Sequence, residues 1–137
     1  MNDLEDLELD IIEENGKYGY ADNAGNIIIP CIWKDASSFS EGLAYVADDN
    51  GNYGYIDKTG KVVIPFIYWD AGFFEDGIAP VRSYQKGWGY IDKTNNVVIP
   101  FNSDWYDAEE FEDGIAKIYD FSYNVFYIDK SGNIVKR

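Results

Sequence analysis

The side chains in this sequence that could do chemistry are mostly carboxylates. Acidic pairs occur at Glu75-Asp76, Glu109-Glu110 and Glu112-Asp113, and a pair of carboxylates is what glycoside hydrolysis requires. Residues 48–52 read Asp-Asp-Asn-Gly-Asn and superficially resemble a calcium-binding loop. That stretch lacks the bidentate glutamate at the twelfth position of such a loop. We therefore interpret it as a hairpin turn.

The absence of histidine narrows the catalytic options further. The chain has no His and one cysteine, Cys31, which removes the commonest general base, the Ser-His and Cys-His pairs and most zinc sites. A phosphate-binding glycine loop and a dinucleotide fingerprint are also missing. The acidic pairs recur beside turn glycines, which is typical of solvated turns. We expect no enzyme, no catalytic residue, no metal site and no cofactor.

The charge of the chain favours a basic partner. Its 25 acids and 11 bases give a formal net charge of −14, and seven of the acids fall within residues 1–14. Binding to nucleic acid or to an anionic membrane would need Lys and Arg, so both are disfavoured. A field of one sign speeds encounter with an oppositely charged protein. The alternative is that the charge serves only solubility.

The sequence also favours a cytoplasmic location. A single cysteine cannot form an internal disulfide, and we interpret Cys31 as a small core residue. The residues after Met1 show no basic and apolar signal segment. No apolar run approaches the 18 residues that a membrane-spanning helix needs.

An internal repeat dominates the sequence. The segment Tyr-Gly-Tyr-Ala-Asp at residues 18–22 recurs as Tyr-Gly-Tyr-Ile-Asp at 53–57 and as Trp-Gly-Tyr-Ile-Asp at 88–92. A fourth copy, residues 126–129, has Phe126 in place of the glycine. Pro30, Pro65 and Pro100 recur with the same spacing. Two extra residues between Phe101 and Trp105 offset the last copy.

These units resemble the WG (or KWG) repeats of bacterial proteins, over residues 16–137. Tyr stands where the family pattern has Trp at positions 18 and 53. The resemblance implies an all-β repeat scaffold. It implies no activity, because such repeats mostly serve as binding or accessory modules.

The repeat predicts a single domain over residues 1–137, built of tandem three-stranded antiparallel meanders. The expected units are about 5–30, 43–65, 78–100 and 115–136, joined by connectors 31–42, 66–77 and 101–114. A three-stranded meander buries too little surface alone, so stacking supplies the core. We expect an open twisted array, with a small closed propeller-like or barrel-like toroid as the alternative.

One turn of each unit carries an Asp-x-x-Gly signature. The last position is Gly or Asn, which tolerate positive φ, and the leading Asp can accept backbone N–H bonds. This predicts a type I turn with a bulge. The structural turn residues are Asp22, Gly25, Asp57, Gly60, Asp92, Asn95, Asp129 and Gly132.

Two further features make predictions about packing. Gly19, Gly54 and Gly89 lie inside strands, so we expect an aromatic ring over each. The connectors carry Asp before Ala and then an anchoring Phe, at Phe39, Phe74 and Phe111. We interpret each Asp as the N-cap of one helical turn, and Asp107 with Glu110 as a capping box.

The aromatic residues are the best candidates for a binding surface. The chain has four Trp and twelve Tyr, and Tyr and Trp are enriched at protein interfaces. Trp88 is expected in the core, whereas Trp69, Tyr84 and Tyr123 are expected to be exposed. The partner-binding candidates are Glu13, Glu14, Asp48, Asp49, Trp69 and Tyr84. Acids of the N-terminal stretch, Asp3, Glu5, Asp6 and Glu8, would add to the steering field.

The sequence therefore favours a non-catalytic protein-interaction module that binds a basic protein, as an inhibitor or immunity protein would. The alternative is a carbohydrate or cell-wall binding module, in which exposed rings stack on sugars. A catalytic protein is a third hypothesis, and two close carboxyls in a deep cleft would favour it. The partner and the oligomeric state are not specified by the sequence.

Overall fold

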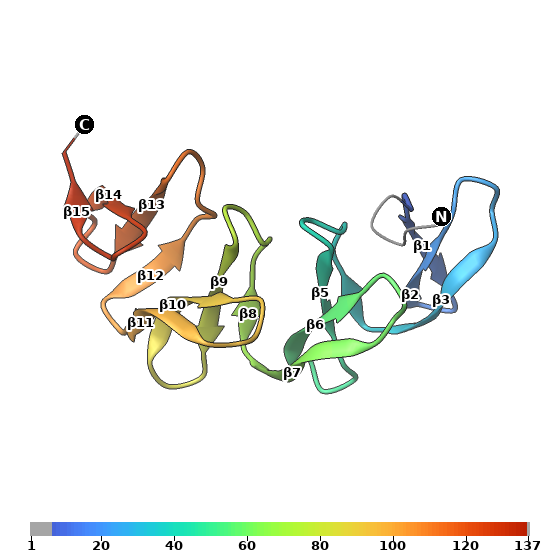
Figure 1. Cartoon of the computed structure of the whole chain (residues 1–137). Coiled ribbons are helices and arrows are strands. Elements are labelled where there is room, and N and C mark those ends of the chain that lie inside the picture. Colours follow the sequence, from blue (N-terminus) through green and yellow to red (C-terminus); the bar gives the residue numbers. More distant parts are fainter. Residues whose placement is uncertain (1–6, 137) are drawn as a thin grey trace. The chain divides into compact units, whose positions relative to one another are not determined.

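The computed structural model describes residues 7–136, and every regular element in that range is a β-strand. The strands form four antiparallel sheets (Figure 1), which we number 1 to 4 along the chain. Sheet 1 contains β1 (Asp10–Glu14), β2 (Lys17–Ala21) and β3 (Ile27–Trp33). Sheet 2 contains β4 (Asp35–Ala36), β5 (Leu43–Ala47), β6 (Tyr53–Asp57) and β7 (Val62–Tyr68). Sheet 3 contains β8 (Asp70–Ala71), β9 (Ile78–Ser83), β10 (Gly87–Asp92) and β11 (Val97–Asn102). Sheet 4 contains β12 (Trp105–Ala108), β13 (Ile115–Asp120), β14 (Val125–Asp129) and β15 (Ile134–Val135).

The expected all-β architecture of antiparallel meanders is confirmed, with one strand more than predicted in sheets 2 to 4. The strands group into two compact units that divide the chain between Ile67 and Tyr68. Unit 1 holds sheet 1 and nearly all of sheet 2, whereas unit 2 holds sheets 3 and 4.

The extra strand corrects the prediction of a helical turn in each connector. Asp35, Asp70 and Asp107 stand in β4, β8 and β12, and each accepts the N–H of the following Ala at 2.8–2.9 Å. Ala36 pairs with Val46 across the sheet. The ladder to the next strand of the same sheet holds the Asp-Ala segment extended, so it cannot begin a helix. Glu110 makes no capping box either, because its Oε2 accepts the N–H of Phe73 at 2.9 Å.

The turns between the last two strands of each sheet have the geometry that the Asp-x-x-Gly signature specifies. In the first turn, the Oδ1 atom of Asp22 accepts the N–H of Ala24 at 3.0 Å and of Asn26 at 2.9 Å. The leading residues Asp57, Asp92 and Asp129 accept the equivalent pair of N–H groups. The last positions all have positive φ: Gly25, Gly60, Asn95 and Gly132.

The strand glycines face a backbone, which corrects the prediction that a ring covers each of them. A Cβ on Gly19 would lie 2.4 Å from the carbonyl oxygen of Ile29, and one on Gly54 would lie 2.5 Å from that of Ile64. Only at Gly89 does a ring also approach, with Cδ1 of Phe101 at 2.8 Å from the Cβ position. The cause is a bulge that shifts the register of β2 against β3 and of β10 against β11. Any larger residue would push these strands apart.

The prolines lie in strands at the sheet edges. Pro30, Pro65 and Pro100 stand in β3, β7 and β11, each an edge strand of its sheet. Proline has no N–H to donate, which is tolerated at an edge. β3 and β7 continue past their prolines to Trp33 and Tyr68, beyond the predicted strand ends.

Each unit has an apolar core that fixes a connector. In unit 1, Tyr20 is fully buried, packs edge-on against Phe39 at 4.8 Å and donates its hydroxyl to the carbonyl oxygen of Ser37 at 2.6 Å. In unit 2, Tyr90 packs against Phe111 at 4.9 Å in the same way. Burial raises the pKa of both tyrosines, so they remain neutral donors.

Candidate interaction surface

Five of the six residues predicted to bind a partner lie at the hairpin tips of sheets 1 to 3, where the hairpin tip is the turn joining the first two long strands of a sheet. The sixth, Trp69, lies between β7 and β8. Glu13 and Glu14 end β1, and Asp48 and Asp49 follow β5. Tyr84 follows β9, at the equivalent place in sheet 3. The tips differ in side-chain chemistry between the units: those of unit 1 carry acidic residues, and those of unit 2 carry aromatic ones.

The acids of unit 1 have unequal freedom to meet a partner. Glu13 and Glu14 are exposed. Asp49 is also exposed but forms an ion pair with Lys17 across the two tips of the unit. Asp48 is a turn residue, because its Oδ1 accepts the N–H groups of Asn50 and Asn52, each at 3.0 Å. Of the predicted N-terminal acids, Glu8 is exposed, whereas Asp3, Glu5 and Asp6 lie outside the described residues.

The two predicted aromatic anchors of unit 2 contact each other on the surface. The rings of Trp69 and Tyr84 are stacked, with centroids 6.1 Å apart and planes 11° from parallel. They remain 48% and 53% exposed. The Cζ atom of Arg82 lies 3.8 Å from the centroid of the Trp69 ring. The backbone N–H of Trp69 also donates to the carbonyl oxygen of Arg82 at 2.8 Å, which holds the Trp69 backbone beside β9.

The remaining large aromatics separate into core and surface. Trp33, Trp88, Trp105 and Tyr68 are buried. The Nε1 of Trp88 donates to the carbonyl oxygen of Tyr106 at 3.0 Å. Tyr123, as expected, is almost fully exposed, at 91%.

A second surface cluster of rings was not singled out from the sequence. Tyr106 lies with its ring centroid 5.9 Å from that of Tyr119 and 5.6 Å from that of Phe121, at the hairpin tip of sheet 4. Phe121 is the repeat equivalent of Tyr84 once the two-residue insertion is allowed for. Aligning the repeats with this insertion would have predicted the cluster from the sequence.

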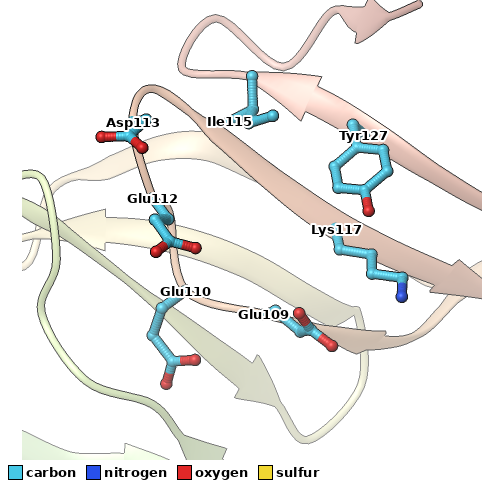
Figure 2. Close-up of a pocket in the computed structure, with 7 residues that line it drawn as sticks. All are labelled: Glu109, Glu110, Glu112, Asp113, Ile115, Lys117 and Tyr127. Atoms are coloured by element: carbon cyan, nitrogen blue, oxygen red, sulfur yellow. The ribbon is translucent and has the colours of Figure 1, made fainter. Parts of the chain in front are cut away.

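Unit 2 also carries an acidic crevice, which we define by Glu109, Glu110, Glu112 and Asp113. Figure 2 shows these carboxylates following one another along the connector, with Lys117 and Tyr127 on the strands beside it. The cavity they line has a volume of about 410 Å³. An adjoining cavity of about 490 Å³ is shared with Glu75 and Asp76. The acidic pairs considered above for catalysis thus come together around these two hollows.

Hydrogen bonds bind the crevice to the rest of unit 2. Asp76 accepts the N–H of Gly114 at 2.9 Å through Oδ2, and its carbonyl oxygen accepts from Lys130. Tyr119 donates its hydroxyl to Glu109 at 2.8 Å. This bond to a carboxylate raises the pKa of Tyr119. The crevice is therefore a fixed surface that is rich in negative charge.

Neither a metal site nor a membrane-spanning helix is found within residues 7–136. Among these residues, no three or more Asp, Glu or Cys side chains are grouped so that they could hold a metal ion. The same part of the chain has no helix with the length and apolarity to cross a bilayer.

The repeats match a known family. The pattern described as WG containing repeat matches three tandem stretches of the chain, residues 18–51, 53–86 and 88–119. None of the curated proteins compared with the chain matches it in sequence.

Several solved structures share the fold at low sequence identity. The computationally designed Ika8 protein has a TM-score of 0.57 and 10% identity, over 90% of this chain and 42% of its own. The designed Ika4 protein has a TM-score of 0.58 and 10% identity, over 89% of this chain and 85% of its own. The WD40 beta propeller domain of Doa1 has a TM-score of 0.53 and 12% identity, over 94% of this chain and 50% of its own. The chain thus spans half or less of the Ika8 and Doa1 chains, and at such identities the likeness concerns the fold alone.

Proposed function

We propose that this chain, which belongs to the WG containing repeat family, is a non-catalytic module that binds a basic protein. The repeat scaffold holds side chains of different chemistry at equivalent hairpin tips. Recognition then depends on those tips and on the acidic crevice.

The stacked pair Trp69 and Tyr84 is the observation that carries the proposal. Both rings lie outside the core, yet their mutual contact and the Arg82 contact hold them in a fixed geometry. Rings ordered before binding lose little conformational entropy when a partner covers them. Exposed and pre-ordered Trp and Tyr side chains are typical anchors of protein interfaces.

The charge distribution supports a basic partner. The cavity lined by the acidic crevice of unit 2 has one lysine, Lys117, among its seven lining residues. In unit 1, Glu13 and Glu14 add exposed carboxylates at the tip of sheet 1. A partner rich in Lys and Arg would be steered towards both units and would pair with their carboxylates.

An inhibitor or immunity protein of the cytoplasm is the specific form of this function that we favour. Such a protein covers a basic surface of a toxin or nuclease. The net charge of −14 over 137 residues is the support for that form.

Binding of a basic peptide tests the proposal. We would titrate the protein with a 16-residue peptide of alternating Lys and Ala by calorimetry, at 50 and 300 mM NaCl. Saturable binding that weakens with salt is expected, because salt screens surface charges. The double variant Trp69→Ala/Tyr84→Ala should weaken binding about tenfold or more, as loss of an anchor does. Tyr123→Ala is the matched control, since Tyr123 is exposed and makes no ring contact among the described residues.

The same rings are the basis of the alternative, a carbohydrate or cell-wall binding module. Titration with soluble wall polysaccharide separates the two functions. Binding of the polysaccharide that depends on Trp69 and Tyr84, with no binding of the basic peptide, would replace our proposal by the alternative.

A further inference from the structure

We propose that the ring cluster at the tip of sheet 4, formed by Tyr106, Tyr119 and Phe121, binds an arginine side chain of the partner. This inference rests on the proposed function and specifies both the contact surface and the chemistry of the residue that it receives.

A β-bulge positions the cluster. β12 pairs with β13 through Trp105 opposite Asp120 and Asp107 opposite Tyr119, so Tyr106 is the extra residue between them. Such a bulge re-aims a side chain, and the Tyr106 ring is 42% exposed. Phe121 is 60% exposed and its N–H donates to the carbonyl oxygen of Asp104 at 2.9 Å. The backbone that carries the two rings is therefore fixed, the rings contact each other with centroids 5.6 Å apart, and both remain exposed.

The tip of sheet 3 shows what an equivalent ring pair receives. Trp69, Arg82 and Tyr84 each lie 37 residues before Tyr106, Tyr119 and Phe121. The pairing agrees, because Asp70 lies opposite Arg82 as Asp107 lies opposite Tyr119. In sheet 3 the chain supplies its own guanidinium, 3.8 Å from the Trp69 ring centroid.

In sheet 4 the position of that arginine is taken by Tyr119. Within residues 7–136, no cation lies over the ring of Tyr106 or Phe121, whereas the Nζ of Lys117 lies 5.3 Å from the centroid of the Tyr119 ring. Tyr106 and Phe121 therefore stand at the ring positions of the sheet 3 tip, with planes 56° apart in place of 11°, and without a guanidinium over them.

Carboxylates next to the cluster complement an incoming cation. Asp104 is exposed beside Phe121, and Glu109 accepts the hydroxyl of Tyr119. Asp120 ends β13 and adds charge as a turn residue, because its Oδ1 accepts the backbone N–H groups of Ser122 and Asn124. A guanidinium can stack on a ring and bind a carboxylate in its own plane at the same time, which the compact ammonium of lysine cannot do. The combination of tilted rings and flanking carboxylates thus favours arginine over lysine.

Two peptides of equal length and charge test the inference: octaarginine and octalysine. We would measure the dissociation constant of each for the wild-type chain, Tyr106→Ala/Phe121→Ala and the control Tyr123→Ala. The wild type should bind octaarginine about fivefold more tightly, a preference of the size that one exposed cation–π contact provides. The double variant should lose this preference while octalysine binding stays within twofold, and Tyr123→Ala should keep it. Thermal unfolding verifies that each variant is folded, and Tyr106→Phe should retain the preference because it keeps the ring.

The outcomes separate this inference from the function on which it rests. If the double variant keeps the preference for arginine, or if Trp69→Ala/Tyr84→Ala is what removes it, the inference is wrong and the proposed function stands. If neither peptide binds the wild type, the proposed function itself is wrong.

Discussion

Tyr90 donates its hydroxyl to the carbonyl oxygen of Glu109, 2.7 Å away and 19 residues later in the chain. The bond ties the core of sheet 3 to the connector that carries the acidic crevice. Tyr20 makes the same bond to Ser37 in unit 1. The buried tyrosine of the repeat therefore fixes the connector in both units, although the connector is acidic at Glu109 and neutral at Ser37.

We expect Tyr90→Phe to lower the free energy of unfolding by about 1 kcal/mol, because the carbonyl of Glu109 loses its donor while the ring is kept. Urea denaturation measures this loss. Tyr123→Phe is the control, since its ring is exposed and the same change should have no effect. An equal effect at both positions would show that the Tyr90 bond does not stabilise the unit.

The glycines inside strands should be intolerant of even one methyl group. Gly19→Ala would place a Cβ 2.4 Å from the carbonyl oxygen of Ile29, so β2 and β3 must separate, at a cost of about 2–3 kcal/mol. Gly16→Ala is the control: its φ is +81° but no atom lies within 4 Å of the new methyl, and about 1 kcal/mol is expected. Denaturant unfolding of both variants compares them. A smaller loss at Gly19 than at Gly16 would contradict the backbone contact.

The turn aspartates should make stability depend on acid. Hydrogen bonds from Asn96, chiefly from its backbone N–H, hold the pKa of Asp92 below its ordinary value of 3.8. The stabilisation is then fully present above that ordinary value and is lost as the pH falls through the lower pKa of the folded state. Asp92→Ala should lower Tm at pH 7, and the difference in Tm between the variant and the wild type should become smaller below about pH 4. A difference that is the same at pH 7 and pH 3 would contradict this.

The two neighbouring acids of the sheet 2 tip should behave differently on charge reversal. Asp49→Lys should slow association with the Lys-Ala peptide severalfold at 50 mM NaCl and leave Tm nearly unchanged, because an exposed ion pair stabilises little. Asp48→Lys should slow association too, but should also cost about 1 kcal/mol of stability by removing two hydrogen bonds to its carboxylate. Stopped-flow binding and thermal unfolding measure the two effects. Unchanged association rates in both variants would exclude the sheet 2 tip from the encounter surface.

Much of the fold follows from the spacing of particular residues. The Asp-x-x-Gly signature specified the turn because both the hydrogen-bonding Asp and the positive φ are local properties. The prolines likewise indicated edge strands. The fourth strand was missed because Asp35-Ala36 is held extended by β5, a tertiary contact that overrides the local N-cap signal.

The candidate surface could be predicted only in part. Trp69 and Tyr84 were singled out because they interrupt the repeat, and the structure brings them together. Their stacking depends on the pairing of β8 with β9, which no local pattern specifies. The sheet 4 cluster was missed because the insertion before Trp105 changes the repeat spacing from 35 to 37 residues, so its positions do not align with those of sheet 3 at the regular spacing.

The indole N–H signals of the four tryptophans, recorded by NMR during titration with the Lys-Ala peptide, test the central claim most directly. Trp69 is exposed, whereas Trp33, Trp88 and Trp105 are buried, so one signal reports on the proposed surface and three report on the core. The account predicts that the Trp69 signal shifts in a saturable manner and that the three core signals stay in place. A Trp69 signal that does not move at saturating peptide would contradict the account.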